Sequence, residues 1–138
     1  MNKHEIIIRE KMLANDALSQ WLGIELISIE PGTCILKMIV RKEMLNGFEI
    51  AHGGITYSLA DSALAFASNS HNIQCVSIET SISHTKSVQE NDVLTAVAKE
   101  LSLSNKIGVY EVTVTNQHHT IVALFKGTVF RTGKLWIE

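Results

Sequence analysis

The stretch that most constrains the fold runs from Asn46 to Asn72 and reads NGFEIAHGGITYSLADSALAFASNSHN. From His52 onward its residues predict one long helix that is apolar on almost every side. A helix with this pattern is buried, because no face of it is suited to water. The rest of the chain must therefore cover it, and most of that remainder has the alternating pattern of strands.

Composition favours one folded domain over residues 1–138, since 46% of the residues are hydrophobic and 19% are charged. The net charge is −2 and no basic run occurs, which argues against nucleic-acid binding. No apolar run approaches the roughly 20 residues of a membrane span, and the N-terminus lacks the pattern of a signal peptide. We therefore expect a cytoplasmic protein without a membrane partner, with Cys34 and Cys75 as reduced thiols.

The segment before the central helix predicts one helix and one hairpin. Residues 3–20 carry apolar side chains at helical spacing, which indicates a short amphipathic helix on the outside of the domain. A strand is expected over residues 23–30. Pro31-Gly32 marks a turn into a second, half-buried strand over residues 33–41.

The segment after the central helix alternates with a period of two. Short polar turns divide it into four expected strands, at residues 73–88, 93–103, 107–115 and 120–131. In the first of these, Val76, Ile78 and Ile82 alternate with polar residues. Consecutive strands with short turns predict an antiparallel meander, so the fold class is α+β. One concave sheet does not cover every side of the helix, and we expect a second copy of the chain to cover the rest.

Asp61 is the one acid in the middle of the apolar helix, and no cation lies within helical reach of it. A buried carboxylate without a partner is costly, so Asp61 has one of two roles. It is a structural acid that accepts a hydrogen bond from a neighbouring Ser or Tyr. Alternatively, it is a base or nucleophile whose pKa is set by a desolvated pocket.

His52-Gly53-Gly54 opens the helix. Two glycines at a helix start allow another group to approach closely, and the free N–H groups there favour a partly negative oxygen. This is the physical basis of an oxyanion hole. The alternative is that the glycines only form a tight entry turn.

The spacing between Gly53 and Asp61 has a consequence for assembly. Along one helix the two residues lie about 12 Å apart, at about 1.5 Å per residue, so both cannot touch one small reacting group. Two copies of the helix packed antiparallel would bring Gly53 of one chain beside Asp61 of the other. A catalytic role therefore predicts a homodimer with two equivalent sites.

These residues carry a resemblance to a known family. The pattern of Asn46, His52-Gly53-Gly54, Leu59-Ala60-Asp61 and Ala67–Ser70 resembles the hotdog-fold thioesterases of the PaaI-type, phenylacetate-degradation branch. The resemblance implies that an antiparallel sheet wraps the central helix and that two chains form one continuous sheet. It also implies dimers that pair into tetramers, and hydrolysis of acyl-CoA thioesters without a metal or other cofactor.

The resemblance also implies roles for individual residues. The Gly53 N–H would polarise the thioester carbonyl, and Asp61 of the partner chain would activate water or attack the carbonyl itself. Asn46 and His52 would shape the site and orient the acyl group or the water. Ser77 matches a position that assists the acid, although a solvent-facing serine is the alternative there.

The expected substrate contacts are Gly54 and Lys86. Many members of the family carry an Arg-Pro pair where this chain has Lys86-Ser87, and a glycine where it has Asn91. Lys86 offers a CoA phosphate a point charge rather than the fork of an arginine. The expected substrates are aromatic acyl-CoAs such as phenylacetyl-CoA, or medium-chain acyl-CoAs.

Two alternatives share the expected fold. One is a dehydratase of hydroxyacyl thioesters, and the other is a non-catalytic sensor that binds acyl-CoA. A zinc enzyme is not expected, because the remaining histidines are isolated or lie in turns without ligand spacing; they are His4, His71, His84, His118 and His119.

Overall fold

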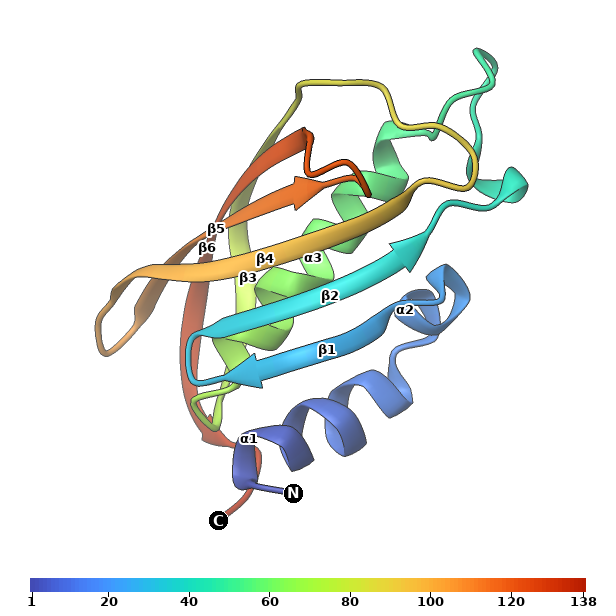
Figure 1. Ribbon diagram of the computed structural model, residues 1–138. Coiled ribbons are helices and arrows are strands. Elements are labelled where there is room, and N and C mark those ends of the chain that lie inside the picture. Colours follow the sequence, from blue (N-terminus) through green and yellow to red (C-terminus); the bar gives the residue numbers. More distant parts are fainter.

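The computed structural model describes residues 1–138 and has one six-stranded antiparallel sheet that curves around a long helix (Figure 1). The elements in chain order are α1 (Lys3–Ile6), the π-helical turn η1 (Ile7–Met12), the 3-10 turn η2 (Leu13–Asn15), α2 (Ala17–Leu22), β1 (Glu25–Glu30), β2 (Thr33–Ile39), the 3-10 turn η3 (Lys42–Met44), α3 (Gly53–Asn69), β3 (Ile73–His84), β4 (Val93–Leu103), β5 (Ile107–Thr115) and β6 (Ile121–Leu135). The predicted α+β class and the central helix are confirmed. No helix is long and apolar enough to cross a membrane.

The central helix α3 begins directly after His52, as the sequence predicted. It packs closely on the concave face of the sheet, and Leu59 and Leu64 are fully buried there. A Cβ at Gly127 of β6 would lie 2.5 Å from Leu64 Cδ2, so only glycine permits this approach of helix to sheet. The core beneath the helix is therefore built from the sheet of the same chain.

The strand order is β1-β2-β4-β5-β6-β3, and every neighbouring pair is antiparallel. The predicted meander is thus correct for β4, β5 and β6 and wrong for β3, which pairs with β6 at the far edge. β4 already has β2 on one side and β5 on the other, so it has no free edge for β3. Residues 85–92 carry the chain back across the sheet between β3 and β4.

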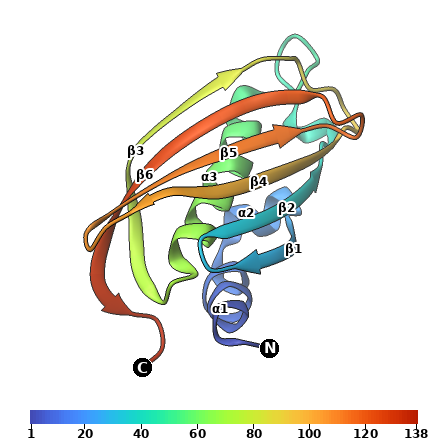
Figure 2. The same ribbon diagram turned by 60° about the vertical axis from the view of Figure 1, so that its left-hand side comes forward.

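Strand β3 forms one edge of the sheet, on the side of α3 opposite β1 (Figure 2). A β-bulge interrupts its pairing with β6. Ser77 pairs with Val129 and Glu79 pairs with the adjacent Thr128, so Ile78 is the extra residue on β3. The expected alternation of Val76, Ile78 and Ile82 is therefore broken. Val76 and Ile78 are 57% and 58% exposed, whereas Ile82 packs against the core.

The N-terminal segment differs from the predicted outer helix. It is helical to Asn15, and α2 then continues to a cap at Gly23 with φ 73°, so β1 starts at Glu25. Ile7 and Ile8 are completely buried, and both η1 and α2 contact α3. The segment thus covers part of the helix surface that was expected to need a second copy.

Candidate active site

The first turn of α3 presents one free amide. His52 caps the helix, and its Nδ1 accepts a hydrogen bond of 2.9 Å from the Gly54 N–H. The Ile55 N–H bonds to the His52 carbonyl at 2.9 Å, but no group accepts from the Gly53 N–H. The Gly53 N–H is therefore an unused donor at the positive end of a 17-residue helix.

A cavity of about 320 Å³ lies beside this turn. It brings together two predicted site residues, Gly53 and Lys86, and it also contains His84, which the sequence pattern did not single out. Its complete lining is Ala51, Gly53, Thr56, His84, Thr85, Lys86, Ser87 and Val88. The cavity has no carboxylate in its lining, so its charged and polar groups suit a negative or partly negative ligand.

Asp61 lies half-buried in the middle of α3 and has no hydrogen-bond partner in the chain. The neighbouring hydroxyls that might have satisfied it bond elsewhere: Tyr57 to Thr80 at 2.6 Å, Ser58 to the Gly54 carbonyl at 2.7 Å, and Ser62 to Ser19 at 2.8 Å. Burial raises the pKa of Asp61 above its ordinary value, and the negative charge of Asp16 raises it further. The carboxylate is therefore not a satisfied structural acid within one chain.

A second, smaller cavity of about 50 Å³ lies at Asp61. Ser77 lines it together with Asp61, so the structure brings these two predicted residues side by side. The other lining residues are Leu64, Ala65, Ser68, Cys75 and Val129. Cys75 is not bonded to Cys34, and burial raises its pKa, which keeps the thiol protonated at this wall.

Strand β3 runs antiparallel to α3, and residues spaced along the strand lie beside successive turns of the helix. Ser77 meets Asp61 in the small cavity, Thr80 bonds Tyr57 in the middle, and His84 reaches the first turn. The two cavities have no lining residue in common. The separation of Gly53 from Asp61 that was expected from the helix rise is thus present within one chain.

Asn46 shapes the loop that leads into α3. Its Oδ1 accepts hydrogen bonds from the Phe48 N–H at 2.9 Å and the Ile50 N–H at 3.5 Å. This holds the turn in which Glu49 has a φ of 62°. A role for Asn46 in orienting an acyl group or a water stays a prediction.

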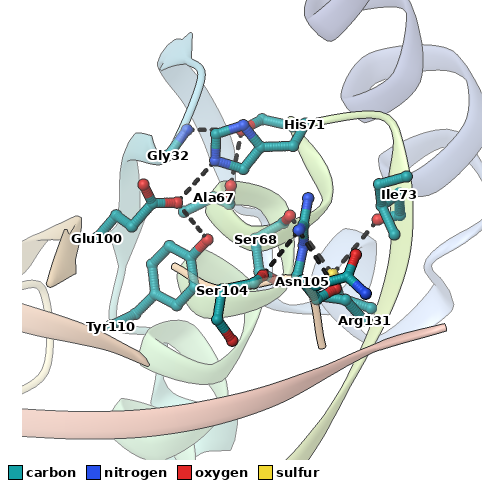
Figure 3. Close-up of polar contacts among 12 residues, drawn as sticks. Gly32, Ala67, Ser68, His71, Ile73, Glu100, Ser104, Asn105, Tyr110 and Arg131 are labelled. Carbon is teal, nitrogen blue, oxygen red and sulfur yellow. Dashed lines mark hydrogen bonds and ion pairs between the residues drawn. The ribbon is translucent and has the colours of Figure 1, made fainter. Parts of the chain in front are cut away.

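A polar cluster at the C-terminal end of α3 lies apart from both cavities. Figure 3 shows His71 and Tyr110 pointing at Glu100, whose Oε1 lies 2.6 Å from His71 Nε2 and 2.7 Å from the Tyr110 hydroxyl. Burial opposes ionisation of Glu100, but the hydrogen bonds from Tyr110 and His71 bring its pKa below the ordinary value. Nearby, Ser70 accepts a hydrogen bond of 2.8 Å from the Gly32 N–H. The cluster thus fastens the end of α3 to the strands around it.

At the Asp61 end, a hydrogen-bonded chain joins α2 to α3. Asp16 caps α2, and its Oδ2 accepts a hydrogen bond of 2.7 Å from the Ser19 hydroxyl. The Ser19 hydroxyl in turn lies 2.8 Å from that of Ser62, the neighbour of Asp61. Ser19 is fully buried, so its hydroxyl, which connects Asp16 to Ser62 beside Asp61, is shielded from water.

We expect Asp16→Asn to lower the pKa of Asp61. Asparagine caps a helix as well as aspartate does, so α2 is retained while the negative charge is lost. Burial still acts on Asp61, and its pKa therefore stays above the ordinary value. A titration of the labelled Asp61 carboxyl by ¹³C NMR measures the change, with the exposed Glu10→Gln as control. An unchanged titration in Asp16→Asn would show that this charge does not act on Asp61.

An antiparallel sheet curved around one helix, with a free amide at the helix start, is the architecture of the hotdog-fold thioester hydrolases. The family model described as the thioesterase superfamily matches residues 48–123. The chain belongs to the thioesterase superfamily and is of its PaaI type, a thioester hydrolase.

Individual relatives agree with this assignment. A putative esterase of Archaeoglobus fulgidus is 40% identical over 92% of this chain and 82% of its own length. The acyl-coenzyme A thioesterase PaaI of Escherichia coli is 38% identical over 88% of this chain and 87% of its own. The solved structure of the E. coli PaaI protein, from the phenylacetic acid degradation operon, matches with a TM-score of 0.90 and 37% identity over 92% of each chain.

A solved structure with a ligand is also similar. The Streptococcus mutans protein smu.793, bound to acetyl CoA, matches with a TM-score of 0.79 and 32% identity, over 81% of this chain and 90% of that one.

Proposed function

We propose that this chain hydrolyses acyl-CoA thioesters to free acid and CoA, at sites that two chains share. The observation that carries the proposal is the pair of unused groups on α3, the Gly53 N–H and the Asp61 carboxylate. One is a donor for a developing oxyanion, and the other is a base or nucleophile in a desolvated setting. The E. coli relative named as an acyl-coenzyme A thioesterase and the S. mutans structure with acetyl CoA support this substrate class.

In the proposed reaction the thioester carbonyl oxygen accepts a hydrogen bond from Gly53 N–H. Asp61 takes a proton from a water that attacks the carbonyl carbon, or attacks that carbon itself. The carbonyl electrons move onto the oxygen, which the amide and the helix dipole stabilise. Re-forming the carbonyl then expels the CoA sulfur as a thiolate, and the acid is released at once or after hydrolysis of the acyl-Asp61 intermediate.

The proposed assembly is a homodimer in which Gly53 of one chain faces Asp61 of the other. Both residues lie on one helix, about 12 Å apart by its rise, so one chain alone does not assemble the site. The free edge of β3, with Val76 and Ile78 more than half exposed, supports pairing of two chains there. Further pairing of dimers and a cytoplasmic location are part of the proposal and rest on the family resemblance and composition.

The remaining predicted residues have supporting roles in the proposal. Ser77 orients Asp61, and Asn46 and His52 hold the loop and the helix start at which the acyl group lies. The Gly54 N–H is already bonded to His52, which leaves Gly54 to provide space rather than a donor. Lys86, which lines the 320 Å³ cavity, offers a positive charge to the CoA portion.

The acyl group we propose is aromatic, such as phenylacetyl, or of medium length. The test is release of free CoA from a panel of acyl-CoAs, in which phenylacetyl-CoA and octanoyl-CoA are compared with acetyl-CoA. We expect hydrolysis well above the buffer rate, fastest for the aromatic or medium-chain esters. Tight binding of these esters without hydrolysis would instead favour the acyl-CoA sensor, and hydration of an enoyl-CoA would favour the dehydratase.

A further inference from the structure

His84 ends strand β3 against the first turn of α3. Its Nε2 lies 3.2 Å from the point where a Cβ on Gly53 would be, and its Cε1 and Cδ2 lie farther away, at 3.5 and 3.8 Å. The tip of the imidazole therefore faces the backbone of Gly53. Neither ring nitrogen of His84 has a hydrogen-bond partner in the chain, and the side chain lines the 320 Å³ cavity together with Gly53.

His84 Nε2 lies on the same side of Gly53 as the free N–H of that residue. Cα–Cβ bonds of a helix tilt toward its N-terminus, and the free N–H groups of the first turn point the same way. An oxygen that accepts from the Gly53 N–H thus sits beside the space that His84 Nε2 borders. A side chain at position 53 would separate the two groups, which gives a reason for glycine there beyond the turn itself.

We infer that His84 is a second hydrogen-bond donor to the thioester carbonyl oxygen, acting together with the Gly53 N–H of the same chain. The inference rests on the proposed acyl-CoA hydrolysis and adds a residue to it. Nε2 carries a hydrogen both in one neutral tautomer and in the imidazolium, so the ring donates in either charge state. The lining of the cavity contains no carboxylate that would compete for this donor.

The donor acts on the charge that develops during the reaction. As the new C–O bond forms, the carbonyl π electrons move onto the oxygen, and two donors share the resulting negative charge. When the C–S bond breaks, those electrons return to the carbonyl and the sulfur leaves as the thiolate. His84 gains and loses no proton in these steps. Because its hydrogen bond strengthens as the charge grows, its contribution appears in kcat rather than in KM.

The test compares two substitutions of His84. His84→Phe keeps an aromatic ring and removes the donor, whereas the amide nitrogen of His84→Gln reaches the place of Nε2. We expect His84→Phe to lower kcat about 10- to 100-fold with little change in KM. This is less than the roughly 10²- to 10³-fold loss for a buried oxyanion donor, because the side chain is exposed. His84→Gln is expected to restore most of the rate. His118→Phe, in the turn after β5, is the control for loss of an exposed imidazole.

A vibrational measurement tests the contact itself. The thioester carbonyl stretch of bound phenylacetyl-CoA is recorded in Asp61→Asn, where turnover is expected to be strongly slowed, with and without His84→Phe. A hydrogen bond from His84 predicts a carbonyl band at lower frequency when the histidine is present. Equal band positions, or a native kcat in His84→Phe, would overturn the inference while acyl-CoA hydrolysis by the native chain still stood. A native chain that hydrolyses no acyl-CoA would instead overturn the proposed function.

Discussion

Asp61→Asn is expected to lower kcat/KM for acyl-CoA hydrolysis by about 10²- to 10⁴-fold, the range for loss of a positioned general base. Asparagine keeps the size and polarity of the side chain but neither accepts a proton from water nor attacks a thioester. The loss is therefore expected whether Asp61 acts as base or as nucleophile. Release of CoA, followed with a thiol reagent on the best ester of the panel, measures it. Glu111→Gln on the outer surface of β5 is the matched control and should retain the native rate.

The same substitution has an opposite effect on stability. The folded state raises the pKa of Asp61, so it disfavours the ionised form relative to the unfolded chain. That penalty is absent below the ordinary pKa of an aspartate and is complete above the raised one. We therefore expect Asp61→Asn to have a higher Tm than the native chain at pH 8 and a similar Tm at acidic pH. An inactive variant with a raised Tm excludes misfolding as the cause, whereas full activity in Asp61→Asn would refute the assigned mechanism.

The central helix was predictable because its evidence is local. Apolar and small residues predominate over residues 53–69 with one charged residue among them, and a His-Gly-Gly start provides a cap and an entry without side chains. The acid at position 61 stood out because it breaks this pattern. The sequence could not show that Tyr57, Ser58 and Ser62 bond elsewhere, since those partners come from distant segments or from the backbone.

The strand order was not predictable, because alternation identifies a strand and one of its faces but not its neighbour. Four strands in sequence suggested a meander, yet β3 is carried to the far edge and pairs with β6. The same crossing brings His84 to Gly53. In the sequence His84 is an isolated histidine, and only the path of β3 along α3 makes it part of the candidate site.

The bulge in β3 was likewise hidden from the sequence. Alternation alone placed Val76, Ile78 and Ile82 in one repeating pattern, whereas one extra residue between Ser77 and Glu79 changes which side chains face the helix. It leaves Ser77 beside Asp61 and exposes two apolar residues at the edge of the sheet. In the proposed dimer this edge is where the two chains pair, so the local irregularity of β3 has a role in that assembly.

Mixed dimers provide the decisive test of that site. Asp61→Asn and Gly53→Val are each expected to be nearly inactive alone, the second because its side chain fills the space at the free amide. In a heterodimer of the two, one shared site carries both substitutions and the other carries neither. Random pairing of equal amounts makes half of the dimers mixed, each with one native site, so the activity per chain should recover to about a quarter of the native value.

The mixture is prepared by unfolding and refolding the two variants together, and the controls are each variant refolded alone. Light scattering at micromolar concentration should give two or four times the chain mass of 15.3 kDa for every sample, and never the mass of one chain. If Gly53 and Asp61 of the same chain formed each site, every site in the mixture would carry one substitution and no activity would return. Recovery thus requires that the two groups come from different chains, which the separation along α3 demands of any site that uses both.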